Sequence, residues 1–279
     1  MRSSLEIYTV ATGAVRCVWQ SDDLYEAPNW DPDGKSLVIN GNGLIYRIPV
    51  TGGEPALIDT GFADQCNNDH GISPDGATIL VSHKNGDEGS VIYSLPATGG
   101  TPVRVTPAFP SYWHGWSPDG GQIAYCARRN GRYEVCVSSV TGEGEVQLTG
   151  VNKDDGHNDG PDYSPDGAWI WFNSDRTGNA QIWKMRPDGT DLTRMTHDAF
   201  VNWFPHPSPC GQHVLYLAYP EGTLFHPRDL DVGLILMAPD GSDAREVLRF
   251  NGGQGSINVP CWSPDGTEFA YVRYGPENA

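Results

Sequence analysis

Positive charge is scarce in this chain. Its 279 residues include 18 lysines and arginines against 35 aspartates and glutamates, a net charge of −17. A field of that sign repels nucleic-acid phosphates and anionic lipid surfaces, so we expect no nucleic-acid partner. The sequence also has no apolar run long enough to cross a bilayer, and we expect no membrane insertion.

Paired cysteine motifs and an export signal are missing as well. None of the six cysteines forms a Cys-x-x-Cys pair, which excludes the common zinc-knuckle and thioredoxin-like patterns. Free, buried thiols suit a reducing compartment. No hydrophobic secretory segment follows Met1, so we expect a cytoplasmic protein, or a periplasmic one if the native N-terminus carries a signal not present here.

Two catalytic or nucleotide-binding signatures are also missing. The run Gly252-Gly253-Gln254-Gly255, which we expect in a loop, is not followed by Lys-Ser/Thr and is not a phosphate loop. No Gly-x-Ser-x-Gly motif is present, so the sequence offers no serine-hydrolase elbow.

A four-residue phrase, typically Ser-Pro-Asp-Gly, recurs along the whole chain. Its copies begin at Asp31, Ser73, Ser117, Ser164, Ser208 and Ser263. They stand 42, 44, 47, 44 and 55 residues apart, the period of a propeller blade. Each copy suits a type I turn, because proline presets φ at the second position and glycine accepts the last one. β-type runs flank each turn.

A second repeat, an apolar strand followed by a glycine-rich turn, alternates with the first. It begins at the N-terminus with Leu5 to Tyr8, before any Ser-Pro-Asp-Gly, and no copy follows the last phrase at Ser263. The N-terminal strands therefore complete the C-terminal blade, which protects the edges of the array. We predict an all-β fold: one domain over residues 1–279, a six-bladed β-propeller of four-stranded blades.

These two repeats resemble those of the TolB-like propellers, whose repeat is often described as WD40-like. The segments 158–167, 202–206 and 252–260 are similar to bacterial TolB-family proteins of unassigned activity. The resemblance implies the propeller fold over the whole chain. TolB itself is expected to carry an additional N-terminal α/β domain, whereas this chain begins directly in a strand, which makes the Tol-Pal scaffold role the less expected one.

In such a repeat, the strand before Ser-Pro-Asp-Gly is innermost, and the loops that lead into it gather on the upper face. Five histidines map to that face, one of them in the long loop between Pro220 and Asp231 of the fifth blade. Polar and aromatic residues accompany them, and the aromatic rings can either stack on a ligand or pack between blades. The predicted ligand-binding residues are His70, Trp113, His114, His157, Asn158, Asp159, Asn202, Trp203, His206, His226, Gln254 and Asn258.

This clustering leaves several functions open. The first is a binding propeller for a small molecule, a glycan or a protein segment. The second is a metal-dependent carbohydrate lyase or hydrolase, since the similar oligogalacturonate lyases are expected to hold a divalent metal through histidines and a glutamine at this location. The ligands would be His157, His206 and His226, and the metal manganese, zinc or iron. The third is a protein-interaction scaffold related to TolB. The histidines can equally be polar lining that bonds neighbouring blades.

Overall fold

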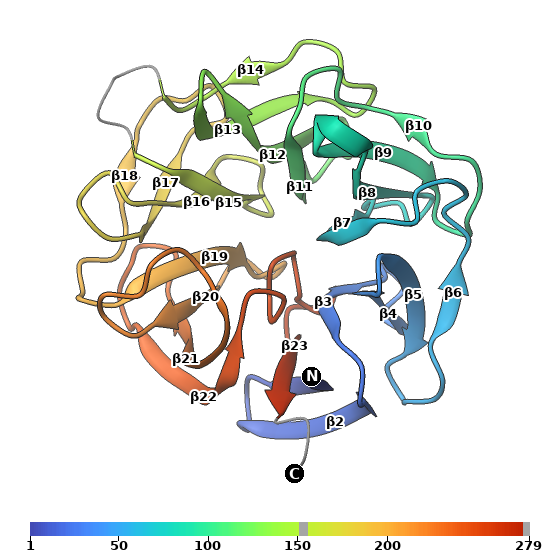
Figure 1. Ribbon diagram of the computed structural model, residues 1–279. Helices are drawn as coiled ribbons and strands as arrows, with labels where there is room; N and C mark the ends of the chain where they lie inside the picture. The colour runs from blue at the N-terminus through green and yellow to red at the C-terminus, as the bar shows by residue number, and fades with distance from the viewer. Residues whose placement is uncertain (151–155, 276–279) are drawn as a thin grey trace. The chain divides into compact units, whose positions relative to one another are not determined.

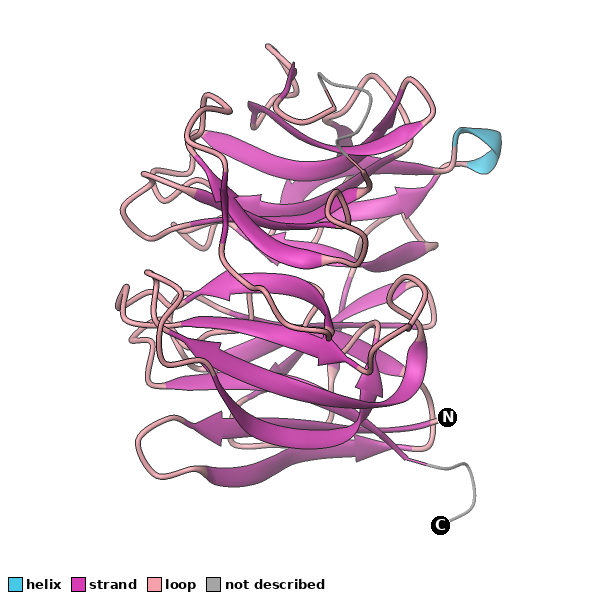
Figure 2. Ribbon diagram, turned by 90° about the vertical axis from the view of Figure 1, so that its left-hand side faces the viewer, coloured by secondary structure: helices cyan, strands magenta, loops and turns pink. Residues whose placement is uncertain are grey.

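The computed structural model describes residues 1–150 and 156–275. Nearly all of its regular structure is antiparallel β-sheet (Figure 2). Among the described residues the one helix is the short 3-10 helix Gly86–Glu88, and no helix is long and apolar enough to cross a membrane. The six sheets are the blades of a six-bladed β-propeller (Figure 1), as predicted.

The chain forms two compact units, residues 1–113 with 254–279 and residues 114–253. The first unit holds the closing sheet and two further blades: β1 (Arg2–Thr9), β2 (Ala14–Ser21) and β23 (Glu268–Gly275); β3 (Tyr25–Trp30), β4 (Ser36–Gly41), β5 (Leu44–Pro49) and β6 (Ala56–Ile58); β7 (Cys66–Ile72), β8 (Thr78–Lys84), β9 (Ser90–Pro96) and β10 (Val103–Arg104). The prediction of a single domain over 1–279 stays a prediction.

The second unit contains the strands of the remaining three blades, apart from the start of β11, which spans the unit boundary. Their strands are β11 (Ser111–Trp116), β12 (Gln122–Arg129), β13 (Arg132–Ser139) and β14 (Val146–Gln147); β15 (Asn158–Tyr163), β16 (Ile170–Ser174), β17 (Gln181–Met185) and β18 (Thr193–Arg194); β19 (Val201–Pro207), β20 (Val214–Tyr219), β21 (Arg228–Met237) and β22 (Arg245–Gly253).

The repeated turns have the predicted geometry. In all six copies the glycine N–H donates to the carbonyl of the first residue, and the glycine has a φ between 68° and 73°. That left-handed conformation favours glycine. In four copies the serine hydroxyl also donates to the aspartate carboxylate two residues later, so the phrase is a self-contained connection between the first and second strands.

The N-terminal strand joins the C-terminal one, which confirms the predicted ring closure. β1 pairs antiparallel with β23 from Arg2 opposite Gly275 to Thr9 opposite Glu268. The closing sheet has three strands in the order β2-β1-β23, and its innermost position is reduced to a bridge between Trp262 and Phe269.

Apolar residues from neighbouring blades interlock to form the core. In the second unit, one buried cluster joins Val135 and Val137 of β13 to Phe172 and Trp183 of the next blade. A second cluster joins that blade to β20 and β21 of the fifth blade. Because these side chains are nearly inaccessible, they form a rigid support for loops at the blade ends. All six cysteines are free.

A β-bulge interrupts several innermost strands. In β3, β15 and β19 the register shifts at a residue–Pro–polar segment, where Ala27, Gly160 and Phe204 adopt φ near 55° to 60°. A bulge turns the side chains before and after it in new directions. The bulges of β15 and β19 therefore determine where the polar side chains of these two strands point.

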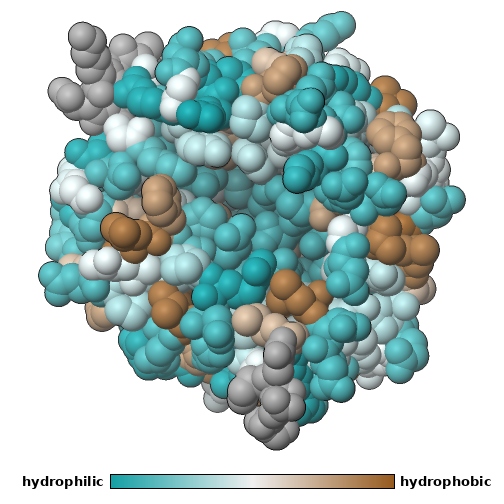
Figure 3. Space-filling model, in the orientation of Figure 1, coloured by the Kyte–Doolittle hydropathy of each residue, from teal (hydrophilic) through white to brown (hydrophobic). Residues whose placement is uncertain are grey.

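Hydrophilic residues predominate on the face shown in Figure 3, and hydrophobic residues form small scattered patches there. This distribution agrees with the excess of 35 acidic over 18 basic residues. Two exposed hydrophobic residues, Leu224 and Phe225, lie in the loop between β20 and β21. That loop ends at Pro227, because β21 begins at Arg228, earlier than the sequence indicated.

Candidate functional site

One buried carboxylate, that of Asp159, faces three imidazoles in the second unit. Its Oδ1 lies 3.2 Å from His114 Nε2, and its Oδ2 lies 3.5 Å from His157 Nε2 and 3.8 Å from His226 Nε2. The sequence predicted all four residues as part of a site. We call Asp159, His114, His157 and His226 the Asp159 cluster.

Each member of the Asp159 cluster comes from a different structural context. Asp159 lies in β15 immediately before the bulge at Gly160, whose N–H donates to Asp159 Oδ1 at 2.8 Å. His114 lies in β11, and His157 directly precedes β15. His226 lies in the loop between β20 and β21. Three blades therefore contribute to one polar centre.

Three members of the Asp159 cluster have pKa values that are shifted in different directions. Burial by itself would raise the pKa of Asp159, but hydrogen bonds and charge from His114 and His157 outweigh burial and hold this pKa well below its usual range. Burial opposes protonation of His157, but Asp159 outweighs it and raises the pKa of His157. Burial lowers the pKa of His226. An ionised carboxylate thus lies between an imidazole that favours its charged form and one that favours its neutral form.

Aromatic rings surround these imidazoles. The Tyr133 ring stacks on His157 with centroids 4.8 Å apart, and the Trp203 ring lies 4.3 Å from His226. Phe204 contacts both His226 and His114. These contacts fix the ring planes of the histidines, and they reduce the water available to the carboxylate.

A cavity of about 230 Å³ opens beside the cluster. Its walls include His157, Asp175, Asn179, Trp203, Leu224 and Phe225. Leu224 and Phe225 are 80% and 66% exposed, so the outer lip of the cavity is apolar. The cavity is therefore mostly apolar, with polar groups from His157, Asp175 and Asn179 on its walls, and it fits an organic ligand with both kinds of surface.

Three buried polar atoms at this site have no hydrogen-bond partner within the described residues. They are Nδ1 of His226, Nε1 of Trp203 and Nε2 of His157, the last of which faces Asp159 without hydrogen-bond geometry. Buried polar groups are nearly always hydrogen-bonded, because leaving one unpaired costs about 1–3 kcal/mol. Within the described residues these atoms are therefore exceptions to the usual pairing of buried polar groups.

Three other predicted residues of the second unit bond elsewhere. His206 Nδ1 lies 3.0 Å from Asp162 Oδ2, and burial raises the pKa of Asp162 although His206 partly offsets it. The Asn158 amide donates to Glu134 and accepts from Arg176. The Asn202 amide donates to Asp198 and Thr196. These bonds tie the innermost strands to neighbouring strands and loops.

The remaining predicted residues lie in the first unit. His70 is fully buried with Nε2 3.3 Å from Val38 O, and Trp113 is buried against Gly71. Gln254 accepts a bond from the Tyr274 hydroxyl through its carbonyl, and Asn258 accepts one from the Gly255 N–H. Gly252 and Gly253 end β22 rather than lying in the predicted loop, because the long β21 extends the pairing to Gly253.

The predicted metal ligands do not form one group. His157 and His226 face Asp159, whereas His206 bonds to Asp162. Within residues 1–150 and 156–275, no three His, Cys, Asp or Glu side chains are arranged to hold a metal ion. The Nε2 atoms of His157 and His226 face the Asp159 carboxylate, and the predicted metal stays a prediction.

Sequence reasoning missed Tyr133 and Asn179. Tyr133 follows the Asn130-Gly131 hairpin, and Asn179 precedes β17. Both positions are at the blade end that carries His157. The sequence signal that could have identified these two residues is the hairpin between the second and third strands of a blade. This hairpin opens on the same face as the loops into the innermost strands.

Comparisons with known proteins agree with this architecture. The TolB β-propeller domain family matches residues 114–233. An uncharacterized protein of Agrobacterium fabrum is 52% identical over 99% of this chain and 94% of its own length. A solved TolB-like protein from Agrobacterium tumefaciens has 52% identity and a TM-score of 0.95, with 99% of each chain covered.

More distant structures share the fold alone. TolB from Acinetobacter baumannii is 21% identical with a TM-score of 0.70, covering 90% of this chain and 64% of its own. An oligogalacturonate lyase in complex with manganese is 15% identical with a TM-score of 0.58, covering 98% of this chain and 82% of its own.

Proposed function

Because the chain belongs to the TolB-like β-propeller family, we propose that it is a binding propeller whose site is the Asp159 cluster and the adjoining cavity. The ligand is a small molecule, or the end of a glycan or peptide, that carries a hydroxyl or amide beside an apolar surface. The observation that carries this proposal is the cluster itself, in which three imidazoles surround one ionised carboxylate.

The contacts support specific roles in binding. Asp175 and Asn179 on the cavity wall offer polar partners to a ligand hydroxyl or amide, and His157 presents an imidazole of raised pKa beside them. Phe225 and Leu224 cover the apolar part of the ligand. A cavity of about 230 Å³ accommodates a group of monosaccharide size, so a larger ligand would place only its end there.

The test is a ligand-observed NMR titration of the full chain with galacturonate, glucose, N-acetylglucosamine and short peptides. His226→Ala and Asp159→Asn should weaken binding of any positive probe about tenfold or more, since each removes a polar partner in a buried site. His197→Ala, at an exposed histidine that lines neither cavity, is the matched control. Binding that is unchanged in His226→Ala and Asp159→Asn would contradict the proposal.

A second candidate is an enzyme that cleaves a carbohydrate. It is favoured by the ionised Asp159 beside an imidazole of raised pKa, His157, a pair suited to general acid–base chemistry. Chelator treatment separates this candidate's metal-dependent form from simple binding. Binding that survives removal of all metal, with no product formed from oligogalacturonate, favours the binding propeller. Metal-dependent product formation that His157→Ala abolishes favours the enzyme.

A further inference from the structure

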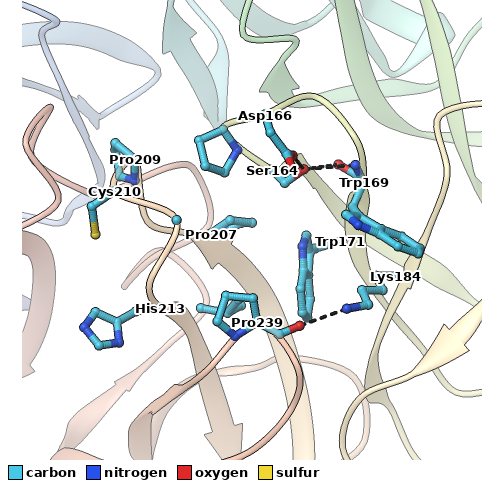
Figure 4. Close-up of a pocket in the computed structure, with 13 residues that line it drawn as sticks. Ser164, Asp166, Trp169, Trp171, Lys184, Pro207, Pro209, Cys210, His213 and Pro239 are labelled. Atoms are coloured by element: carbon cyan, nitrogen blue, oxygen red, sulfur yellow. Dashed lines mark hydrogen bonds between the residues drawn. The ribbon is translucent and has the colours of Figure 1, made fainter.

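A second cavity lies between the fourth and fifth blades, at the ends that carry the Ser-Pro-Asp-Gly turns. It measures about 460 Å³, within the range of small-molecule sites. Residues on its walls include Trp169, Trp171, Lys184, Pro207, Cys210 and Pro239. In Figure 4 the Trp171 ring stands in the middle of the view, with Pro207 and Pro209 on one side and Trp169 on the other. None of these residues belongs to the Asp159 cluster.

The ammonium group of Lys184 is held in place on this wall. Nζ lies 4.8 Å from the Trp169 ring centroid and 5.0 Å from that of Trp171. It donates one hydrogen bond, of 2.8 Å, to the Pro239 carbonyl, shown as a dashed line in Figure 4. Because an ammonium has three N–H groups, two are left to donate. Among the described residues Lys184 forms no ion pair with a carboxylate.

An equivalent position in the first blade makes this arrangement informative. Arg47 pairs with Val38, the seventh residue after Asp31. Lys184 pairs in the same way with Trp171, the seventh residue after Ser164. Arg47 likewise donates to a carbonyl of the next blade, that of Ala97. Asp31 of its own blade neutralises Arg47 at 3.1 Å. In the fourth blade Ser164 stands where Asp31 stands, so Lys184 has no carboxylate at that position of its own turn phrase. The charge of Asp240 acts on Lys184 without a direct ion pair.

The turn at the rim of this cavity has also lost a carboxylate. Five of the six turn phrases have aspartate at the third position, and the fifth-blade copy has Cys210 instead. Cys210 is exposed, and its Sγ lies 3.3 Å from Ser208 Oγ. The aspartate of the neighbouring turn, Asp166, is occupied by bonds from Ser164 and Ala168. The rim thus carries the ionised Asp166 but lacks the second aspartate that the repeat otherwise supplies.

We propose that this cavity binds a small planar carboxylate, such as an arene carboxylate. The ring lies against the tryptophan and proline walls, and the carboxylate accepts the two remaining N–H groups of Lys184. Charge-assisted hydrogen bonds of this kind are stronger than neutral ones. The ammonium of Lys184, beside a rim with one aspartate fewer than the repeat supplies, favours an anion over a neutral ligand.

The experiment is isothermal titration calorimetry of the full chain with 2-naphthoate and with the neutral 2-naphthalenemethanol. We expect saturable binding of the anion that Lys184→Met weakens about tenfold, because methionine keeps the apolar stem and removes the charge. Cys210→Asp, which restores the usual turn residue, should weaken binding several-fold by repulsion. Cys17→Asp places the same charge change at another exposed cysteine and should leave the affinity unchanged.

Several results would overturn the proposal. They are no saturable binding of 2-naphthoate up to about 10 mM, equal affinity for the neutral analogue, or equal affinities of Lys184→Met and the unaltered protein. Circular dichroism checks the fold of each variant, and Cys210→Asp decides the question if Lys184→Met is unfolded. Asp159→Asn should bind 2-naphthoate normally, which separates this site from the proposed function.

Discussion

At the scale of single residues, burial decides what each histidine does. His157 and His226 retain partial access to solvent beside the cavity, so they are available to a ligand. His70 is fully enclosed, and its Nε2 lies 3.3 Å from Val38 O. Similar positions in the repeat therefore hold histidines with different roles, and a positive charge on His70 is the more costly because none of the described carboxylates acts on it.

The stability of the protein should fall at acid pH through His70. Burial lowers its pKa to about 4 from a usual value of 6.5. Below the higher value the unfolded chain binds a proton that the folded chain refuses, so stability is lost as the pH falls from 6.5 toward 4. Between about pH 7.5 and about pH 5 we expect the unaltered protein to lose about 2 kcal/mol more than His70→Gln.

Urea denaturation at the two pH values measures this difference. The comparison isolates His70, because the other histidines are the same in both proteins. Equal losses of unfolding free energy in the two proteins would show that His70 binds its proton as readily in the folded state as in the unfolded state.

At the scale of strands, the innermost strands depend on close contact with the innermost strand of the next blade as well as on hydrogen-bonded pairing within their own blade. Two of them have glycine two residues before the serine of the turn, Gly71 in β7 and Gly115 in β11. The Trp113 ring lies against Gly71, and Asp162 lies against Gly115. A side chain in place of either glycine would occupy the space of its neighbour, so these glycines bring adjacent innermost strands into contact.

Gly71→Ala should lower the free energy of unfolding by about 1–3 kcal/mol, the usual cost of overpacking a core. A Cβ at this position would lie 2.0 Å from Trp113 Cη2, and the buried ring cannot move away easily. Gly275→Ala is the matched control, since its Cβ would meet its nearest neighbour at 3.7 Å. Chemical denaturation compares the two variants, and equal stabilities would contradict the packing argument.

At the scale of the whole molecule, the ends of the chain are joined through one sheet. Leu5 of β1 lies opposite Val272 of β23, and both belong to a buried cluster that also includes Trp30 and Leu37 of the next blade. Glu6 of β1 is buried as well, and it accepts hydrogen bonds from Tyr271 and Arg273. Apolar packing and polar contacts therefore act together in closing the fold.

A double-mutant cycle tests this closure. Leu5→Ala should cost about 2–5 kcal/mol and Val272→Ala somewhat less, as for other buried aliphatic truncations. The cost of the double variant should differ from the sum of the single costs by about 0.5–3 kcal/mol, because the two side chains share one cluster. Strict additivity in urea denaturation would mean that the N-terminal and C-terminal strands are energetically independent.

The sequence by itself determined the class of fold, the number of blades and the closure. These features follow from local chemistry: a Pro-Asp-Gly turn and an apolar strand need only adjacent residues, and their spacing is visible along the chain. The same period identified which loops share a face, and it placed His114, His157, Asp159 and His226 together before the structure did.

Only the tertiary structure decided which polar groups meet. His206 bonds to Asp162 rather than joining the Asp159 cluster, because bulges in β15 and β19 turn these side chains. No pattern in the sequence predicts such contacts, since the partners come from different blades. The position of Lys184 likewise depends on the Pro239 carbonyl of the neighbouring blade, and only folding brings those residues together.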